Sequence, residues 1–317
     1  MGAADRPPVG LAGVTVRCPA KLNLCLSVGA PDPTPGAGGR HPLVSAMLAL
    51  DWGDDVTITR RPGAGLSLAR RWARDAPSPS PIDWPEREDL VWKAAEAFLD
   101  AAGLKPGVGL EVVKRVPCGG GLGGGSGDAA GVLLGISRLW PEAVADERLD
   151  ALAAGLGSDV TFALHALRGR AVAAVSGFGE RVEALRVGEA GFHCVLVFPP
   201  FGCPTRRVFA NLDARLAAGE RPGGIGVEEV KAAAALGWSP LVALGNNLSG
   251  PAADAQPELR ALLRDLAEAS LDARVTGSGS TLFIPADGAD AAEEAAALAA
   301  RVTGLPTLAV SGPPRAR

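Results

Sequence analysis

The feature that most constrains this chain is the glycine-rich stretch "VPCGGGLGGGSGDAA" at residues 116–130. Six glycines and one leucine lie between a proline-cysteine pair and Ser126, and a helical, alanine-rich segment follows. Glycine loses more conformational freedom on folding than any other residue, so such a dense run weakens the local structure. The chain must therefore use bare backbone at this point.

Two common explanations of the stretch are disfavoured and a third is excluded. A flexible linker would not join a strong strand to a strong helix. The dinucleotide fingerprint G-x-G-x-x-G is matched by Gly119, Gly121 and Gly124, but it needs a second strand ending in an acidic residue, and the segment that follows has helical character. A Walker A loop is excluded because no Gly-Lys pair occurs in the chain.

The remaining explanation is a phosphate-binding loop of another type. Glycines allow successive N–H groups to aim at one point, and the following helix, expected to begin near Ser126, adds the positive end of its dipole. The Ser126 hydroxyl is placed to bind a phosphate or a magnesium ion. Asp128 lies in the first turn, where ordinary stabilisation of the helix N-terminus explains it as well as a direct role does.

The composition limits the partners. A net charge of −4 and a pI near 5.5 give no general attraction to nucleic acid or to an anionic membrane. With neither a signal-peptide pattern nor eighteen consecutive apolar residues, we expect a cytoplasmic protein without a membrane segment. The five cysteines form no C-x-x-C pair and are expected to be reduced, and the three histidines lack metal-site spacing.

Strand and helix patterns mix irregularly along the chain, which predicts an α+β fold rather than a doubly wound sheet. The length of 317 residues suits two domains, and we place them at 1–186 and 187–317. Alternating apolar residues predict strands at 14–30 and 41–61, with a turn at 52–54 in the second. No internal repeat is evident.

Four further sequence features bear on the site. The proline- and charge-rich segment 70–88 is expected to be a surface excursion. Helices are expected from Asp89, and after two capping residues, Ser158 and Thr205. Lys21 and Asn23 lie two apart in an apolar strand and so point to one face, although a lysine there is more often exposed than functional. The stretch "TGSGSTLF" at 276–283 alone indicates only a hairpin.

Together these segments resemble the GHMP kinases, the family of galactose, homoserine, mevalonate and phosphomevalonate kinases. The segments that match are "PAKLNL" at 19–24, "KRVPCGGGLGGGSGDAA" at 114–130, "LGSDVTF" at 156–162 and "VTGSGSTLF" at 275–283. They occur in the family's order and span most of the chain. Within the family, the likeness is strongest to members that phosphorylate 4-diphosphocytidyl-2-C-methyl-D-erythritol in the non-mevalonate isoprenoid pathway.

The resemblance implies a ribosomal protein S5 domain 2-like N-terminal domain and a ferredoxin-like C-terminal domain, with ATP and acceptor between them. It implies transfer of the ATP γ-phosphoryl group, with Mg²⁺, to the acceptor's 2-hydroxyl. Asp159 falls at the family's catalytic aspartate and Lys21 at its partner lysine. A carboxylate can orient a tertiary alcohol and accept its proton, while a lysine keeps the carboxylate ionised. Without the resemblance, Asp159 would be explained as a second capping residue.

The resemblance also implies the ligand contacts. Those with the nucleotide involve Asp89, Lys114, Pro117, Cys118, Gly119, Gly120, Gly121, Leu122, Gly123, Gly124, Gly125, Ser126 and Gly127. Those with the acceptor involve Asn23, His41, Thr205 and Phe209. Phe209 would stack on cytosine, an interaction worth about 1 to 3 kcal/mol per base, although plain helix core explains it nearly as well. Ser126 is the one candidate metal ligand, and the chain could be a monomer or a homodimer.

Several positions depart from the family pattern. Gly39-Arg40-His41 stands where Gly-Tyr-His is usual, and Gly127 where a serine or alanine is usual. Asp89 replaces a common asparagine, and "GNNLS" at 245–249 replaces Asn-Asp-Leu-Glu. Because these changes concern the acceptor more than ATP, two alternatives stay open. One is a GHMP kinase with a sugar, homoserine or mevalonate-type acceptor, and the other is a non-catalytic nucleotide or metabolite sensor.

Overall fold

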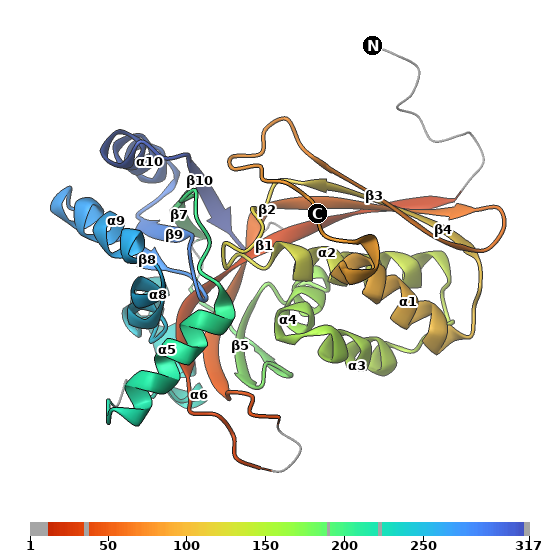
Figure 1. Cartoon of the computed structure of the whole chain (residues 1–317), viewed down its shortest axis with the longest axis horizontal. Coiled ribbons are helices and arrows are strands. Elements are labelled where there is room, and N and C mark those ends of the chain that lie inside the picture. Colours follow the sequence, from red (N-terminus) through yellow and green to blue (C-terminus); the bar gives the residue numbers. More distant parts are fainter. Residues whose placement is uncertain (1–11, 35–37, 189–190, 221–223, 314–317) are drawn as a thin grey trace.

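The computed structural model describes residues 12–34, 38–188, 191–220 and 224–313. Within these ranges the chain forms two β-sheets, each packed against helices (Figure 1). The first sheet has six strands in the order β3-β4-β2-β5-β6, with β1 paired to β2, and the second has four in the order β10-β7-β9-β8. The predicted α+β class is confirmed.

The first half of the chain supplies the six-stranded sheet and the helices that cover it. Its strands are β1 (Gly13–Val28), β2 (Leu43–Arg61), β3 (Gly65–Trp72), β4 (Gly107–Lys114), β5 (Val172–Gly177) and β6 (Arg181–Ala184). Its helices are the short η1 (Glu86–Glu88), α1 (Leu90–Ala102), α2 (Gly124–Leu139), α3 (Asp146–Leu156) and α4 (Ser158–Leu167).

The second half supplies the four-stranded antiparallel sheet and its helices. The strands are β7 (Phe192–Val197), β8 (Arg274–Val275), β9 (Leu282–Ala286) and β10 (Thr307–Gly312). The helices are α5 (Thr205–Ala217), α6 (Val227–Leu236), α7 (Trp238–Ala243), α8 (Ser249–Ala255), α9 (Pro257–Glu268) and α10 (Ala289–Thr303).

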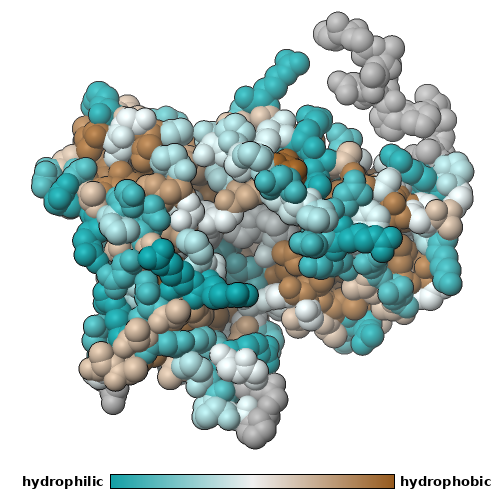
Figure 2. All heavy atoms as spheres, viewed as in Figure 1, coloured by the Kyte–Doolittle hydropathy of each residue, from teal (hydrophilic) through white to brown (hydrophobic). Residues whose placement is uncertain are grey.

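The two halves share a hydrophobic core. Leu22 of β1 and Leu48 of β2 belong to the same buried cluster as Leu196 of β7 and Phe283 of β9. Figure 2 shows that the molecular surface is hollowed between the two lobes, with hydrophilic side chains over much of this face. The division into 1–186 and 187–317 stays a prediction. In the part of the chain that the structure describes, no helix is both long and apolar enough to cross a membrane.

Strand β2 is continuous, so the turn predicted at 52–54 is wrong. Gly53 lies opposite Pro19, next to a register shift between β1 and β2. A Cβ atom on Gly53 would lie only 2.0 Å from the carbonyl oxygen of Cys18. The glycine therefore permits a close approach of two strands rather than a change of direction. Because the strand continues, the next residue, Asp54, is completely buried.

Strand β1 carries two irregularities around its polar pair. Its register against β2 shifts between Pro19 and Lys21 and again between Asn23 and Cys25. Such bulges change the direction of side chains and are frequent beside active sites. Both Lys21 and Asn23 are buried, at 7% and 2% exposure, so the expectation that a lysine here is exposed does not hold.

Helix α2 packs on β1 and β2 through a row of glycines. A Cβ atom on Gly131 would lie 2.3 Å from Sγ of Cys18, and one on Gly135 would lie 2.3 Å from Cδ1 of Ile58. One turn earlier, a Cβ atom on Gly127 would lie 3.1 Å from the carbonyl oxygen of Pro19. The unexpected glycine at position 127 thus continues a face that approaches the sheet closely.

Two predicted helix caps are wrong. Ser158 and Thr205 are the first residues of α4 and α5, and the N-cap positions are occupied by Gly157 and Pro204. Neither helix has a side-chain hydrogen bond at its cap. The Thr205 hydroxyl instead lies 3.1 Å from Oγ of Ser278, so it joins the helix to the C-terminal glycine-serine turn.

The glycine row of α2 gives a stability prediction. Gly131→Ala should lower the free energy of unfolding by about 1 to 3 kcal/mol, because the added methyl group overlaps Cys18. The matched control is Gly155→Ala in α3, where an added Cβ atom meets nothing within 4 Å, and it should raise the free energy of unfolding by up to about 1 kcal/mol. Denaturant unfolding measures both, and equal stabilities would contradict the tight packing.

Candidate active site

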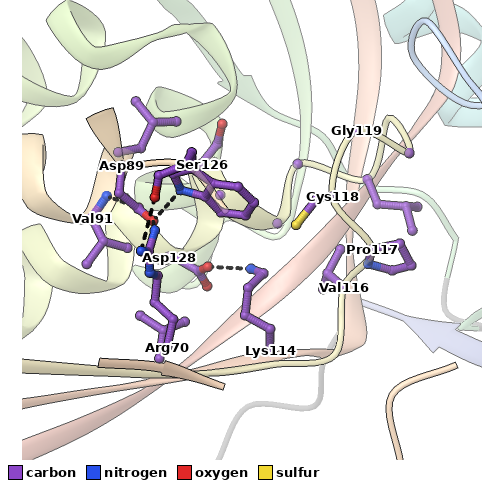
Figure 3. Close-up of a pocket in the computed structure, with 18 of the residues that line it drawn as sticks. Arg70, Asp89, Val91, Lys114, Val116, Pro117, Cys118, Gly119, Ser126 and Asp128 are labelled. Atoms are coloured by element: carbon purple, nitrogen blue, oxygen red, sulfur yellow. Dashed lines mark hydrogen bonds and ion pairs between the residues drawn. The ribbon is translucent and has the colours of Figure 1, made fainter. Parts of the chain in front are cut away.

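A cavity of about 360 Å³ opens beside the glycine-rich loop. Its wall includes the loop residues 116–126, the beginning of α1, and Lys114 at the end of β4 (Figure 3). Arg70 and Trp84, from the segment expected to be a surface excursion, also line it. The expectation is wrong at Arg70, which belongs to strand β3, whereas Trp84 lies in the irregular segment that follows.

The loop backbone has the conformation that glycine favours. Gly119, Gly121 and Gly123 have φ angles of +73°, +80° and +68°, in the left-handed region. Helix α2 begins at Gly124, two residues before the predicted start, and the N–H of Gly127 donates to the carbonyl of Gly123. The amides before that bond belong to the helix N-terminus, the part of a helix that binds anions.

Lys21 and Asp159 meet directly beside this loop. Lys21 Nζ lies 3.6 Å from Oδ2 of Asp159, which is in the first turn of α4. A Cβ atom on Gly123 would lie 2.9 Å from Cγ of Lys21 and 3.7 Å from Oδ2 of Asp159. Segments about 140 residues apart in sequence thus place a cation, a carboxylate and the anion-binding loop together.

Asn23 holds the lysine in place. Its Oδ1 lies 2.5 Å from Nζ of Lys21, and its Nδ2 donates to Oγ of Ser45. The backbone N–H of Asn23 donates to Oγ1 of Thr276 in the C-terminal turn. Both side-chain polar atoms are already engaged within the protein, so the contact of Asn23 with the acceptor stays a prediction.

The C-terminal glycine-serine turn is part of this site rather than a simple hairpin. The N–H of Thr281 donates to the carbonyl of Gly120 in the nucleotide loop. A Cβ atom on Gly277 would lie 3.3 Å from Nζ of Lys21. Asn246 supports the turn, because its Nδ2 donates to the carbonyls of Val275 and Gly277.

The residues predicted to bind the acceptor base lie beside this turn. Thr205 contacts Ser278, and Phe209 lies one turn further along α5. The Phe209 ring is edge-on to His41, with 5.0 Å between ring centroids. Nδ1 of His41 lies 2.8 Å from the carbonyl oxygen of Gly29. The structure therefore brings together the residues that the sequence separates by more than 160 positions.

Arg40, which replaces the expected tyrosine, contacts another aromatic ring. Its guanidinium carbon lies 4.2 Å from the ring centroid of Phe178, which follows strand β5. Cation–π contacts of this kind fix a guanidinium over an aromatic face. Arg40 thus keeps an aromatic partner at a position where the family pattern would supply the ring itself.

Below the loop, one lysine bridges two buried carboxylates. Lys114 Nζ lies 2.5 Å from Oδ2 of Asp54 and 2.7 Å from Oδ2 of Asp128 (Figure 3 shows the second contact). Asp54 also accepts from the backbone N–H groups of Arg115 and Val116. The cluster therefore ties the beginning of the loop to Asp128, which lies just past the first turn of α2 because the helix begins at Gly124. The nucleotide contact predicted for Lys114 stays a prediction.

The burial of this cluster changes its acid–base properties. Burial raises the pKa of Asp128 to about 8, against the opposing effect of Lys114. For Lys114, burial alone would lower the pKa, but the carboxylates of Asp128 and Asp54 raise it overall. The nearby carboxylate of Asp54 adds to this effect of burial on the pKa of Asp128. Stabilisation of the first helical turn does not account for Asp128, and a direct role stays a prediction.

Asp89, expected as the acidic first residue of a helix, is the N-cap of α1 and has further partners. Its Oδ1 accepts from the N–H of Val91, while its Oδ2 accepts from Arg70 and from the indole N–H of Trp84. Figure 3 shows Arg70 pointing to Asp89. Asp89 lines the cavity, as predicted for a nucleotide contact, but both oxygens have protein partners.

Sequence reasoning missed three residues of this region. Asp54 was missed because Gly53 was interpreted as part of a turn. A lone glycine inside a strand pattern also indicates a close approach of two backbones, and that signal was available. Arg70 was assigned to the excursion although it belongs to strand β3, and Trp84 lies in an irregular segment whose sequence has no periodicity. Among the described residues, no group of three or more histidine, cysteine or acidic side chains could hold a metal ion.

Comparison with known families agrees with this arrangement. The profile of the "GHMP kinases N terminal domain" matches residues 89–166, and that of the "GHMP kinases C terminal" matches residues 227–303. The first match spans the nucleotide loop and Asp159, and the second spans the helices that lead to the C-terminal turn. The chain belongs to the GHMP kinases, a family that uses ATP as phosphoryl donor.

Its curated relatives carry a more particular name. The chain is 37% identical over 287 residues to the 4-diphosphocytidyl-2-C-methyl-D-erythritol kinase of Nocardia farcinica, covering 90% of this chain and 88% of the relative. It is also 37% identical to the kinase of that name from Pseudarthrobacter chlorophenolicus, over 98% of this chain and 96% of the relative.

Solved structures give the same grouping. The crystal structure of a 4-(cytidine 5'-diphospho)-2C-methyl-D-erythritol kinase superposes with a TM-score of 0.72 at 32% identity, over 94% of this chain and 98% of that one. A homoserine kinase from Cytophaga hutchinsonii superposes with a TM-score of 0.65 at 16% identity, over 95% of this chain and 94% of that one. The second likeness concerns the fold alone. The two-domain GHMP kinase fold implied by the sequence is confirmed.

The buried cluster gives a pH-dependent prediction. Because the pKa of Asp128 is about 8 when folded and about 3.9 when unfolded, the folded chain retains a proton that the unfolded chain releases. This group's contribution to stability therefore falls as the pH rises from about 4 to 8. Asp128→Asn has no such titrating group, so its free energy of unfolding lacks this decrease with pH. The free energy of unfolding of the variant minus that of wild type should therefore rise with pH, by up to about 1.4 kcal/mol per pH unit.

Urea unfolding between pH 5 and 8, without nucleotide or divalent cations, measures this effect. The control is Asp146→Asn, which changes a carboxylate whose side chain is 85% exposed and should give no such trend. A constant stability difference between Asp128→Asn and wild type would mean that Asp128 is ionised in the folded protein.

Proposed function

We propose that this protein phosphorylates the 2-hydroxyl of 4-diphosphocytidyl-2-C-methyl-D-erythritol with ATP. The observation that carries the proposal is the meeting of Lys21 and Asp159 beside the glycine-rich loop, in a chain whose relatives bear that activity in their names. The likeness covers nearly the whole of both chains, and so includes both halves of this one. We also propose a cytoplasmic location for the reaction.

Asp159 is the proposed catalytic base. Its carboxylate accepts the proton of the acceptor hydroxyl as the oxygen attacks the γ-phosphorus, and the bond from that phosphorus to the β-phosphate oxygen breaks to release ADP. Lys21, held by Asn23, lies 3.6 Å away. The ammonium keeps the carboxylate ionised before the reaction and offsets negative charge in the transition state.

The glycine-rich loop is the proposed binding site of the nucleotide phosphates. The left-handed glycines and the N-terminus of α2 supply backbone N–H donors, which bind anions without a side-chain cation. Mg²⁺, when bound, neutralises charge on the phosphates. The Ser126 hydroxyl is the oxygen donor that suits it, and phosphates and water would complete its coordination, as is usual where the protein offers few carboxylates.

His41, Thr205 and Phe209 form the proposed subsite for the cytidine end of the acceptor. They lie on a continuous path from Lys21 through Gly277 and Ser278. A flat aromatic face suits stacking on a pyrimidine. The His41 ring is held beside it, with Nδ1 at the carbonyl of Gly29 and Nε2 3.6 Å from Oδ1 of Asp213. The proposal therefore places the reacting hydroxyl near Asp159 and the base near Phe209.

The alternative acceptors keep the same chemistry. One observation favours a different acceptor. Arg40 stands at the position of the usual tyrosine, and its guanidinium contacts the ring of Phe178. A panel containing the cytidyl-erythritol, homoserine, mevalonate and galactose, followed by ADP release with ATP and Mg²⁺, separates the two. Turnover of another alcohol without turnover of the cytidyl-erythritol would refute the proposed acceptor. The absence of ADP release with every one of these alcohols would favour a sensor.

Asp159→Asn provides the mechanistic test. It should lower kcat by roughly 10² to 10⁴, because the acceptor loses its proton-accepting group, while ADP affinity by calorimetry stays within a few-fold of wild type. The control is Ser158→Ala, which removes the neighbouring hydroxyl that makes no capping hydrogen bond and should leave kcat unchanged. A fully active Asp159→Asn enzyme would exclude Asp159 as the base.

A further inference from the structure

The segment that follows strand β3 returns to the nucleotide cavity. Strand β3 ends at Trp72, and the chain reaches α1 only at Leu90. In between, the indole N–H of Trp72 donates to the carbonyl of Ser80, which closes the excursion on itself. Trp84, near the end of the excursion, lines the cavity. The excursion thus contributes an aromatic side chain to a site otherwise built from the loop and the ordered elements around it.

Trp84 is held in a defined orientation. Its indole N–H donates to Oδ2 of Asp89 at 2.9 Å, and its carbonyl accepts from Nη2 of Arg70 at 3.2 Å. The guanidinium carbon of Arg70 lies 5.3 Å from the Trp84 ring centroid, and Arg70 itself forms an ion pair with Asp89 at 3.1 Å. Because Asp89 also caps α1, the indole is fixed to the rigid beginning of that helix.

The surroundings of Trp84 suit a base rather than a phosphate. Outside the loop residues 118–126, the apolar members of the cavity wall are Trp84, Leu90, Val91, Val112, Val116 and Pro117. The backbone N–H groups that suit phosphates come from the glycines and the start of α2, along the rest of the wall. A nucleoside triphosphate has the same division into a flat apolar base and a charged tail. Its base therefore belongs with the apolar members.

We propose that Trp84 forms a stacking wall for the purine base of the bound nucleotide, and that Arg70 and Asp89 are its positioning residues. The inference rests on the proposed use of ATP at this site and adds the residue that binds the base. Every nucleobase has a π-face, so a tryptophan that is already oriented loses little freedom when a base stacks on it. The chain contains tryptophan but no tyrosine, and the indole of Trp84 makes the stacking contact with the base.

Calorimetric titration with ADP tests the proposal without any acceptor. Trp84→Ala should raise the Kd for ADP at least about five-fold, the lower end of what loss of a stacked aromatic produces. Trp84→Phe, which keeps a ring but loses the indole N–H, should bind ADP more tightly than Trp84→Leu, which keeps apolar bulk without a ring. In steady-state kinetics, the KM for ATP should rise and the KM for the acceptor should not.

Trp72→Ala is the matched control. Trp72 belongs to the same excursion and also anchors it through an indole hydrogen bond, but it is not part of the cavity wall. Its Kd for ADP should remain within about two-fold of the wild-type value. Circular dichroism establishes that each variant is folded before titration.

The outcomes separate this inference from the proposed function. If wild type fails to bind ADP, both fall together. If wild type binds ADP and Trp84→Ala binds equally well, the stacking role is overturned and the kinase function stands. If Trp72→Ala and Trp84→Ala raise the Kd for ADP equally, stacking is also overturned, because the effect then comes from the fold of the excursion. If Trp84→Phe and Trp84→Leu raise the Kd equally, stacking is overturned as well, because the effect then comes from apolar bulk.

Discussion

The arrangement of the site depends on a single buried ammonium group, that of Lys114. It joins Asp54 of β2 to Asp128 of α2, and Asp54 in turn binds the backbone where the glycine-rich loop begins. Burying such charges is unfavourable unless each has a partner, and removal of one partner leaves the others uncompensated. A loop made almost entirely of glycine has little side-chain packing to hold it. The ion cluster fixes the two ends of the loop from below and leaves its backbone available to a ligand.

The parts of the fold that sequence could predict are those with local signals. Three such signals are each visible within about fifteen residues. They are the apolar alternation of β1, the residues Asp89 and Gly103 at the two ends of α1, and the strand-glycine-helix order of the nucleotide loop. The misinterpreted positions depend on distant neighbours. Gly53 resembles a turn until Cys18 is known to face it, and Trp84 has no pattern until Asp89 binds it. The pairing of Lys21 with Asp159 was predicted only through family resemblance.

The departures from the family pattern also have physical partners. Asn247 accepts from the N–H of Val28 and donates to the carbonyl of the same residue, so its amide imitates a neighbouring strand. Asn246 holds the C-terminal turn, and Gly127 permits the close contact of α2 with Pro19. Asn247 therefore joins the two halves, whereas Asn246 and Gly127 make close contacts within one half each. The acceptor subsite, where Arg40 contacts Phe178, is the region that differs in chemical character.

The contact between the two glycine turns has a consequence for how such a site can change over time. Main chain contacts main chain at two points. The N–H of Thr281 donates to the carbonyl of Gly120, and Gly121 lies close to the carbonyl of Thr276. Main-chain atoms are the same in every sequence. Ordinary substitutions around them therefore cannot alter the seam, provided that the glycines remain. A chain that shares only 37% of its residues with a relative can thus keep the same phosphate-binding geometry while its outer pockets are free to diversify.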